Sequence, residues 1–134
     1  MKESWIIPCN VKVFDVVEHF KSSDTICWKR GAGEKNGDTV YVYIGIPYKA
    51  IMYRCIVIDD HVSKEEMKEH AYATKGNLGT GYRYMKLQKE KEFKEPVDLA
   101  TIKDLGVYMV RKQSRVDRKV LAYLNNKEKA EEEV

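Results

Sequence analysis

Two adjacent strand patterns constrain the fold of this chain more than any other feature. In residues 39–45, valine and isoleucine occupy every second position and tyrosines fall between them, which is typical of a β-strand with two different faces. Residues 50–59 form a second, longer apolar run, and the connection between the runs contains Pro47 and Tyr48. The sequence therefore predicts a β-hairpin with an aromatic residue at the tip of its loop.

Weaker patterns on either side complete the predicted order of elements. We expect further strands over residues 5–9, 25–28 and 82–93 and helices over 13–21, 99–105 and 114–126, with another helix start near Ser63. Residues 71–81 contain three glycines and few apolar side chains, so they are expected to form a loop. Antiparallel strands with helices at their ends predict an α+β fold around a partly closed barrel.

The length and the charge distribution indicate one domain with a charged end. A chain of 134 residues can bury a core without disulfides or metals. Residues 127–134 carry two positive and four negative charges, whereas the rest of the chain has a net charge of +5. We therefore expect a single domain over residues 1–126 and a charged tail over residues 127–134. The basic body is compatible with nucleic-acid binding.

Cysteine usage and hydropathy indicate a cellular compartment. Cys9, Cys27 and Cys55 are widely spaced within apolar runs, a pattern that predicts buried thiols in a reducing cytoplasm rather than a zinc or redox site. No apolar run approaches the ~20 residues that span a bilayer, and the N-terminus does not look like a secretory signal. We expect a cytoplasmic protein with no metal, no cofactor and no membrane partner.

No catalytic arrangement is visible in the sequence. Asp38, Asp59 and Asp60 are the acids that an enzyme acting on a nucleotide would use, but no base or metal set can be matched to them. The glycines between residues 31 and 37 are not followed by the helix or the Gly-Lys-Ser/Thr of a phosphate-binding loop. We predict that the protein is not an enzyme. The alternatives are a nucleotide-processing enzyme, a small-ligand binder and a protein-interaction adaptor.

Aromatic residues beside basic ones indicate a site that stacks a flat, anionic partner, and a nucleobase fits this description. A flipped base offers two π faces and a polar edge, so reading it requires aromatic walls and fixed donors or acceptors. Trp28 is the first candidate wall, with a place in the core as its alternative, and Asn10 is either an edge reader or the N-cap of the first helix. The candidate pocket residues are Trp28, Trp5, Asn10, Pro8, Tyr43 and Tyr48.

Several basic residues are candidates for contacts with phosphates. The set comprises Lys29, Arg30, Arg83, Arg111 and Arg115. Runs of charge are usually solvated faces with no partner, so each of these residues also has that simpler interpretation. Lys29 and Arg30 follow Trp28 directly, which would place them beside the base pocket.

The order of several residues along the chain, among them Trp5, Pro8, Asn10, Ile26–Lys29, Gly37–Tyr43 and Gln113–Arg115, resembles that of the EVE domain, a member of the PUA-like superfamily. The branch that the chain resembles is the one linked to HNH-type nucleases in restriction-like systems. The resemblance implies a PUA-like mixed β-barrel with flanking helices and a pocket that holds a flipped, modified base, such as methylated adenine or cytosine in DNA. The matching positions are Trp5, Pro8, Asn10, Asp15, Ile26–Lys29, Gly37–Tyr43, Pro47, Gly106 and Gln113–Arg115.

The resemblance also bears on partners. The chain has no His-Asn-His arrangement, so any nuclease that acts with it would be a separate protein. The matching segment of the family carries an arginine at the position of Arg115, which supports a phosphate contact there. PUA-like domains serve both nucleic acids, so an RNA-binding module similar to PUA or YTH domains is the main alternative.

Overall fold

The computed structural model describes residues 2–63, 65–66 and 83–132. Its strands are β1 (Ser4–Cys9), β2 (Thr25–Arg30), β3 (Thr39–Ile44), β4 (Ala50–Val62), β5 (Arg83–Asp98) and β6 (Ser114–Arg115), and its helices include α1 (Val16–His19), α4 (Leu99–Asp104) and α5 (Arg118–Glu132). The helix predicted after Ser63 is described only at Glu65 and Glu66, where it is helical. The loop predicted over residues 71–81 lies outside the described residues.

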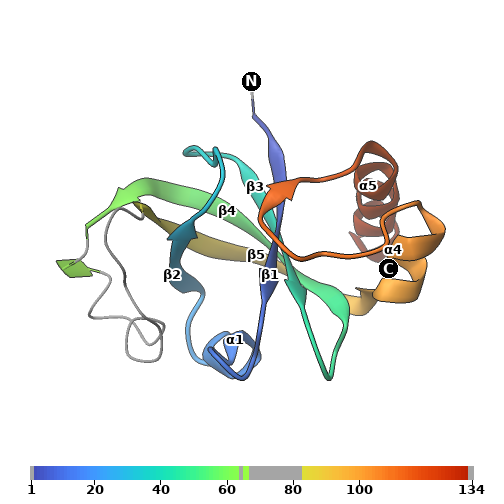
Figure 1. Cartoon of the computed structure of the whole chain (residues 1–134), viewed down its shortest axis with the longest axis horizontal. Coiled ribbons are helices and arrows are strands. Elements are labelled where there is room, and N and C mark those ends of the chain that lie inside the picture. The colour runs from blue at the N-terminus through green and yellow to red at the C-terminus, as the bar shows by residue number, and fades with distance from the viewer. Residues whose placement is uncertain (1, 64, 67–82, 133–134) are drawn as a thin grey trace.

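The strands form one curled, mixed sheet in the order β2-β5-β4-β3-β1-β6. β1 pairs parallel with β3, and the remaining neighbours pair antiparallel. Figure 1 shows α4 and α5 together on one side of the sheet and α1 away from them. This arrangement confirms the predicted α+β fold, a partly closed barrel with flanking helices.

The alternation of side chains along the strands separates two cores. Val40, Val42 and Ile44 of β3 contribute to a core shared with α1, which we call the α1-side core. Tyr41 and Tyr43 point to the opposite face, where they pack with apolar residues of α4 and α5 in the α5-side core. The predicted two-residue period is thus confirmed, and both faces of β3 are buried.

The three cysteines are buried and free, as predicted. Burial raises the pKa of the Cys9 and Cys55 thiols to about 12 and that of Cys27 to about 11. These thiols are therefore protonated at neutral pH and act as small apolar side chains.

The first helix is shorter than the predicted range of 13–21. The carbonyl of Asn10 accepts hydrogen bonds from the backbone N–H groups of Val13 and Phe14, at 2.9 and 3.0 Å. This turn holds the chain out of the helix until Asp15, whose carboxylate accepts from the backbone N–H of Glu18 at 3.1 Å. Asp15 is therefore the N-cap, and the alternative interpretation of Asn10 as the N-cap is wrong.

The strand before α4 also differs from its predicted end. We expected it to end at residue 93, but β5 continues through Pro96 to Asp98. The pairing of β4 with β5 changes register between Tyr53 opposite Glu92 and Ile51 opposite Val97. Pro96 falls in this irregular stretch, where its missing N–H breaks no regular ladder.

The last predicted helix, over residues 114–126, begins and ends later than expected. Ser114 and Arg115 form β6, which pairs with β1, and the backbone N–H of Val116 donates to the carbonyl of Ser4 at 3.0 Å. Asp117 accepts hydrogen bonds from the backbone of Lys119 and Val120, which starts α5 after the strand. Residues 127–132, which we expected in a charged tail, continue this helix.

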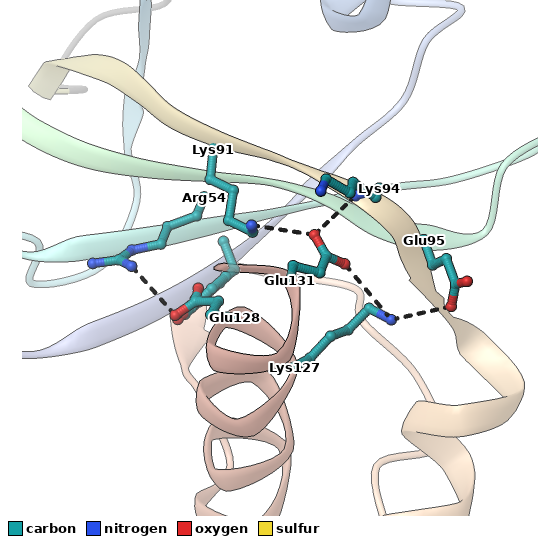
Figure 2. Close-up of polar contacts among 8 residues, drawn as sticks. Arg54, Lys91, Lys94, Glu95, Lys127, Glu128 and Glu131 are labelled. Carbon is teal, nitrogen blue, oxygen red and sulfur yellow. Dashed lines mark hydrogen bonds and ion pairs between the residues drawn. The ribbon is translucent and has the colours of Figure 1, made fainter. Parts of the chain in front are cut away.

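Charged side chains near the end of α5 join the helix to the sheet (Figure 2). Glu128 is only 7% exposed. Its carboxylate accepts hydrogen bonds from the Tyr41 hydroxyl at 3.1 Å and from Arg54 Nη1 at 3.2 Å. A carboxylate at this depth is tolerated because each of its oxygens has a partner.

Glu131 makes a second set of contacts one turn further along α5 (Figure 2). Its Oε1 lies 3.1 Å from Lys91 Nζ and accepts from the backbone N–H of Lys94 at 3.0 Å. Lys127 lies 3.9 Å from Glu131 and 3.7 Å from Glu95. The end of α5 is therefore held to β5 by charges rather than by apolar contacts.

We predict that Glu131 makes folding stability depend on acid. Burial alone would raise the pKa of this carboxyl, but the contacts with Lys94 and Lys91 outweigh it and hold the pKa below its usual 4.5. The stabilisation is therefore complete above about pH 4.5 and is lost as the pH falls through the lower pKa of the folded state. At neutral pH, the unfolding free energy of the Glu131→Gln variant should be about 1 kcal/mol lower than that of the wild type. On acidification, the variant should lose less stability than the wild type, because it lacks this carboxylate.

Urea unfolding of both proteins between neutral pH and about pH 3 measures this difference. Glu132→Gln is the matched control, because Glu132 is exposed on the same turn of α5. An acid-induced loss that is equal in Glu131→Gln and the wild type would contradict the prediction.

Candidate functional site

The structure divides the predicted pocket residues between the two faces of the sheet. Pro8 of β1 lies opposite Tyr43 of β3 in the parallel register, so both belong to the face that bears Tyr41. Trp5 lies an odd number of positions from Pro8 along β1 and therefore faces the other way, into the α1-side core. A single pocket cannot be built from Trp5, Pro8 and Tyr43 together.

A cavity of about 430 Å³ lies where β1 and β3 end, and we call it the Asn10 cavity. It brings together three of the predicted pocket residues, Pro8, Asn10 and Tyr43, with Arg111, which was predicted to contact phosphate. Its volume is within the range of about 300–1,000 Å³ that is common for small-molecule sites. The residues that line it are Pro8, Cys9, Asn10, Lys12, Tyr43, Gly45, Ile46, Val110 and Arg111.

The polar groups of the Asn10 cavity are mostly donors. The Asn10 side-chain oxygen accepts from the backbone N–H of Lys12 at 2.9 Å, and its amide NH₂ has no partner among the described residues. Burial raises the pKa of Tyr43, so its hydroxyl is protonated at neutral pH. Lys12 and Arg111 add two exposed cations. The cavity is therefore suited to a ligand that carries acceptors or negative charge.

Trp28 lies in the core rather than along this cavity. Its ring is 6% exposed and meets the Phe14 ring edge to face, with 6.2 Å between centroids. Both residues belong to the α1-side core. The structure thus supports the core alternative for Trp28 and places it outside the Asn10 cavity.

Trp5 is equally buried and is held by a carboxylate. It is 6% exposed, and its indole N–H donates to Asp38 Oδ2 at 2.8 Å. Asp38 also accepts from the backbone N–H groups of Glu3 and Lys35, at 3.1 and 3.0 Å. Burial alone would raise the pKa of Asp38, but the hydrogen bonds from these three donors together outweigh burial and hold the pKa below its usual value. Asp38 is therefore a structural anion and not a free acid.

Tyr48 lies apart from the other predicted pocket residues. It is 43% exposed in the loop between β3 and β4. Its backbone N–H donates to the carbonyl of Gly45 at 3.0 Å. The loop contributes Gly45 and Ile46 to the Asn10 cavity, but not Tyr48.

Two of the predicted phosphate contacts, Lys29 and Arg30, lie away from the Asn10 cavity. Arg30 donates from Nε to the carbonyl of Glu34, so its side chain is used within its own loop. Lys29 lies half-buried on the same strand, and its carbonyl accepts from Gln113 Nε2 at 2.8 Å. The side chain of Arg83 lies outside the described residues.

Arg115 is free to meet a ligand. Its side chain is 70% exposed, its guanidinium lies 5.6 Å from the centre of the Trp5 ring, and its ion pair with Glu3 is long, at 4.0 Å. Exposed pairs of this kind contribute little to stability. Arg115 can therefore exchange Glu3 for a phosphate at small cost.

Gln113 has a role that the sequence pattern did not reveal. Its side-chain amide accepts from the backbone N–H of Gly31 at 2.7 Å and donates to the carbonyl of Lys29 at 2.8 Å. β2 and β6 are the two edge strands of the sheet. The two hydrogen bonds of Gln113, the residue before β6, therefore link one edge of the sheet to the other, as pairing with a neighbouring strand would. The one signal for this residue was its place in the segment that resembles the EVE family.

Glu34 was also missed. Its side chain is fully buried. Oε1 accepts a hydrogen bond from the backbone N–H of Ala32 at 2.9 Å, whereas Oε2 has no hydrogen-bond partner among the described residues. A buried carboxylate oxygen in this loop is an acceptor that the described residues do not use.

A second cavity, of about 500 Å³, adjoins the first, and we call it the Val116 cavity. Val110 and Arg111 line both cavities, because the segment between α4 and β6 passes back along β1 (Figure 1). The residues that line the Val116 cavity are Ile6, Ile102, Val107, Met109, Val110, Arg111, Lys112, Ser114, Arg115, Val116, Asp117 and Val120.

Positive charge surrounds both cavities. We call Lys12, Arg111, Lys112 and Arg115 the basic rim; all four are exposed. Asp117 is the acid among the residues that line the two cavities, and its carboxylate accepts from the backbone of α5. The rim therefore presents a cationic surface to an anionic partner.

Other kinds of site find no support in the described ranges. Within residues 2–63, 65–66 and 83–132, no three His, Cys, Asp or Glu side chains gather as metal ligands would. Among the helices described there, none is long and apolar enough to cross a membrane.

Comparison with known proteins identifies the fold. No protein-family model and no curated protein matches the sequence. Solved structures with a similar fold include human THYN1 in complex with 5-methylcytosine-containing DNA, with a TM-score of 0.67, 10% identity and coverage of 93% of this chain and 96% of that chain. ASCH from Zymomonas mobilis matches with a TM-score of 0.60, 10% identity and coverage of 92% and 94%, respectively.

A hypothetical protein from Leishmania major is also similar, with a TM-score of 0.65, 13% identity and 98% of each chain covered. At such low identity the likeness establishes the fold alone. The chain thus has the architecture of the ASCH- and EVE-type PUA-like domains, as the resemblance implied. Its membership of the HNH-linked branch stays a prediction.

We predict that Trp28 stabilises the fold rather than contacting a ligand directly. Replacing a core tryptophan with alanine removes contacts and leaves a cavity, so Trp28→Ala should lower the unfolding free energy by about 3–5 kcal/mol. Tyr48→Ala is the control, because this exposed ring should change the value by no more than about 0.5 kcal/mol. Urea unfolding compares the two variants, and equal midpoints for Trp28→Ala and the wild type would show that Trp28 is not part of the core.

Proposed function

We propose that this protein is a nucleic-acid-binding module that reads a modified base in DNA, and that the flipped base occupies the Asn10 cavity. The observation that carries the proposal is the meeting of Pro8, Asn10, Tyr43 and Arg111, from separate segments, around one cavity with a cationic rim. The alternation of β1 and β3 and the course of the segment before β6 bring these residues together.

The lining of the cavity suits a base. Tyr43 and the Arg111 guanidinium are flat groups against which a base can stack. The amide NH₂ of Asn10 can donate to an acceptor on the base edge. Pro8, Ile46 and Val110 supply apolar surface for a methyl group. These roles divide recognition into stacking, edge reading and detection of the modification.

The basic rim suits the phosphate backbone. Extruding a base costs a few kcal/mol, so the protein must gain free energy from contacts outside the cavity. Lys12, Arg111, Lys112 and Arg115 lie around the openings where the flanking phosphates of a flipped nucleotide would pass. Such contacts release counterions and make the affinity depend on salt.

The fold comparisons support the same class of ligand. Human THYN1, which shares the fold, was solved with DNA that contains 5-methylcytosine. RNA is the alternative ligand, because the chemistry of the cavity admits either nucleic acid. A separate nuclease as effector and the lack of catalytic activity in this chain are further parts of the proposal.

We predict that modified-base preference depends on Asn10. Fluorescence anisotropy at fixed salt would compare one duplex containing unmodified cytosine, 5-methylcytosine, 5-hydroxymethylcytosine or N6-methyladenine, together with matched RNA. The wild type should prefer one modified DNA, and Asn10→Ala should reduce that preference by about tenfold, since a hydrogen bond is worth about 1 kcal/mol or slightly more.

Asn125→Ala is the matched control, because Asn125 is an exposed asparagine on α5. Equal affinity of the wild type for all duplexes would contradict base reading. Preference for the matched RNA would assign the protein to the RNA-binding alternative. A preference that survives Asn10→Ala would place the base outside the Asn10 cavity.

We predict that Arg115 contributes to affinity without contributing to base preference. Arg115→Ala should weaken binding to modified and plain DNA by the same factor and make the slope of log K against log salt shallower by about 1. Anisotropy titrations over a series of salt concentrations measure both effects. Lys103→Ala, an exposed cation on α4, is the control, and an unchanged slope in Arg115→Ala would remove this residue from the phosphate contacts.

A further inference from the structure

The Val116 cavity differs in chemistry from the adjoining Asn10 cavity. Its walls come from β1, α4, the start of α5 and the segment between α4 and β6. The apolar residues that line it are Ile6, Ile102, Val107, Met109, Val110, Val116 and Val120. Ile102 and Val120 are buried at its base, with 0% and 2% exposure. A hydrophobic body of small-molecule size would be removed from water here.

A nucleobase is poorly matched to this cavity. The described residues that line it include no asparagine, glutamine or tyrosine, and Ser114 supplies the one uncharged polar side chain among them. Asp117 is used as a cap, since its Oδ1 accepts from the backbone N–H of Lys119 at 2.9 Å. Polar base edges would be left without partners there, at a cost in free energy. The occupant should therefore have an apolar body.

The mouth of the cavity selects the charge of that occupant. Arg111, Lys112 and Arg115 are exposed around it. Arg111 and Lys112 form no recorded ion pair within the described ranges, and the pair between Arg115 and Glu3 is long, at 4.0 Å. The N-terminus of α5, a helix of 15 residues, also lies at this mouth, where the carboxylate of Asp117 caps it.

We infer that the Val116 cavity binds a small amphipathic carboxylate, with its hydrocarbon body against Ile102, Val116 and Val120 and its carboxylate at Arg111 and Lys112. The combination of an apolar floor and a mouth where three cations outnumber the one lining carboxylate, Asp117, distinguishes this ligand from a neutral hydrophobe and from a hydrophilic anion. The inference does not depend on nucleic-acid binding, because its apolar floor of Ile102, Val116 and Val120 is not part of the Asn10 cavity, although the two cavities share Val110 and Arg111.

The test uses the full chain and two matched probes, sodium decanoate and decanol, which have the same hydrocarbon length and differ in charge. Isothermal titration calorimetry below the concentrations at which the probes aggregate should show saturable 1:1 binding of decanoate and at least tenfold weaker binding of decanol. Lys112→Glu should weaken decanoate binding about tenfold without changing that of decanol, whereas Lys103→Glu should change neither.

Val116→Trp should abolish decanoate binding by filling the cavity, and circular dichroism reports whether the variant folds. Val107→Phe fills the other wall and serves as the second variant if Val116→Trp is unfolded. Equal affinities for decanoate and decanol, no saturable binding, or decanoate binding that is unchanged in both Lys112→Glu and the folded cavity-filling variant would overturn the inference.

Discussion

The rest of the structure depends on the hydrogen bonds that the carboxylate of Asp38 accepts. This carboxylate accepts from Trp5 Nε1 and from the backbone N–H groups of Glu3 and Lys35, and so joins the start of β1 to the turn before β3. A buried carboxylate requires such partners, and here they set the parallel register in which Pro8 lies opposite Tyr43. The Asn10 cavity exists because the two strands end together at this register.

The second requirement is the fastening of α5 to the sheet. Val120 and Leu124 are buried in the α5-side core, and Glu128 and Glu131 pair with the strands beyond them. With α4 and α5 in place, the segment between α4 and β6 must return along β1, where Val110 and Arg111 separate the two cavities. Packing far from the cavities thus determines their shape and the position of their positive charge.

Sequence reasoning succeeded where local patterns decide structure. The alternation over residues 39–45 predicted both faces of β3, and the resemblance to EVE domains predicted the PUA-like fold. It failed where distant contacts compete with local preference. Ser114 and Arg115 read as the start of a helix, but pairing with β1 makes them a strand, and the apolar stripe from Val116 onward could not show this.

The candidate site shows the same division. The sequence by itself determined which residues carry aromatic, amide and cationic side chains, but it grouped Trp5 and Pro8 in one pocket, whereas they lie on opposite faces of β1. Only the tertiary structure decided that Trp28 lies in the core and that Pro8, Asn10 and Tyr43 meet Arg111 around one cavity. The reason is physical: a side chain's chemistry is local, but its burial and neighbours depend on how sheet and helices pack.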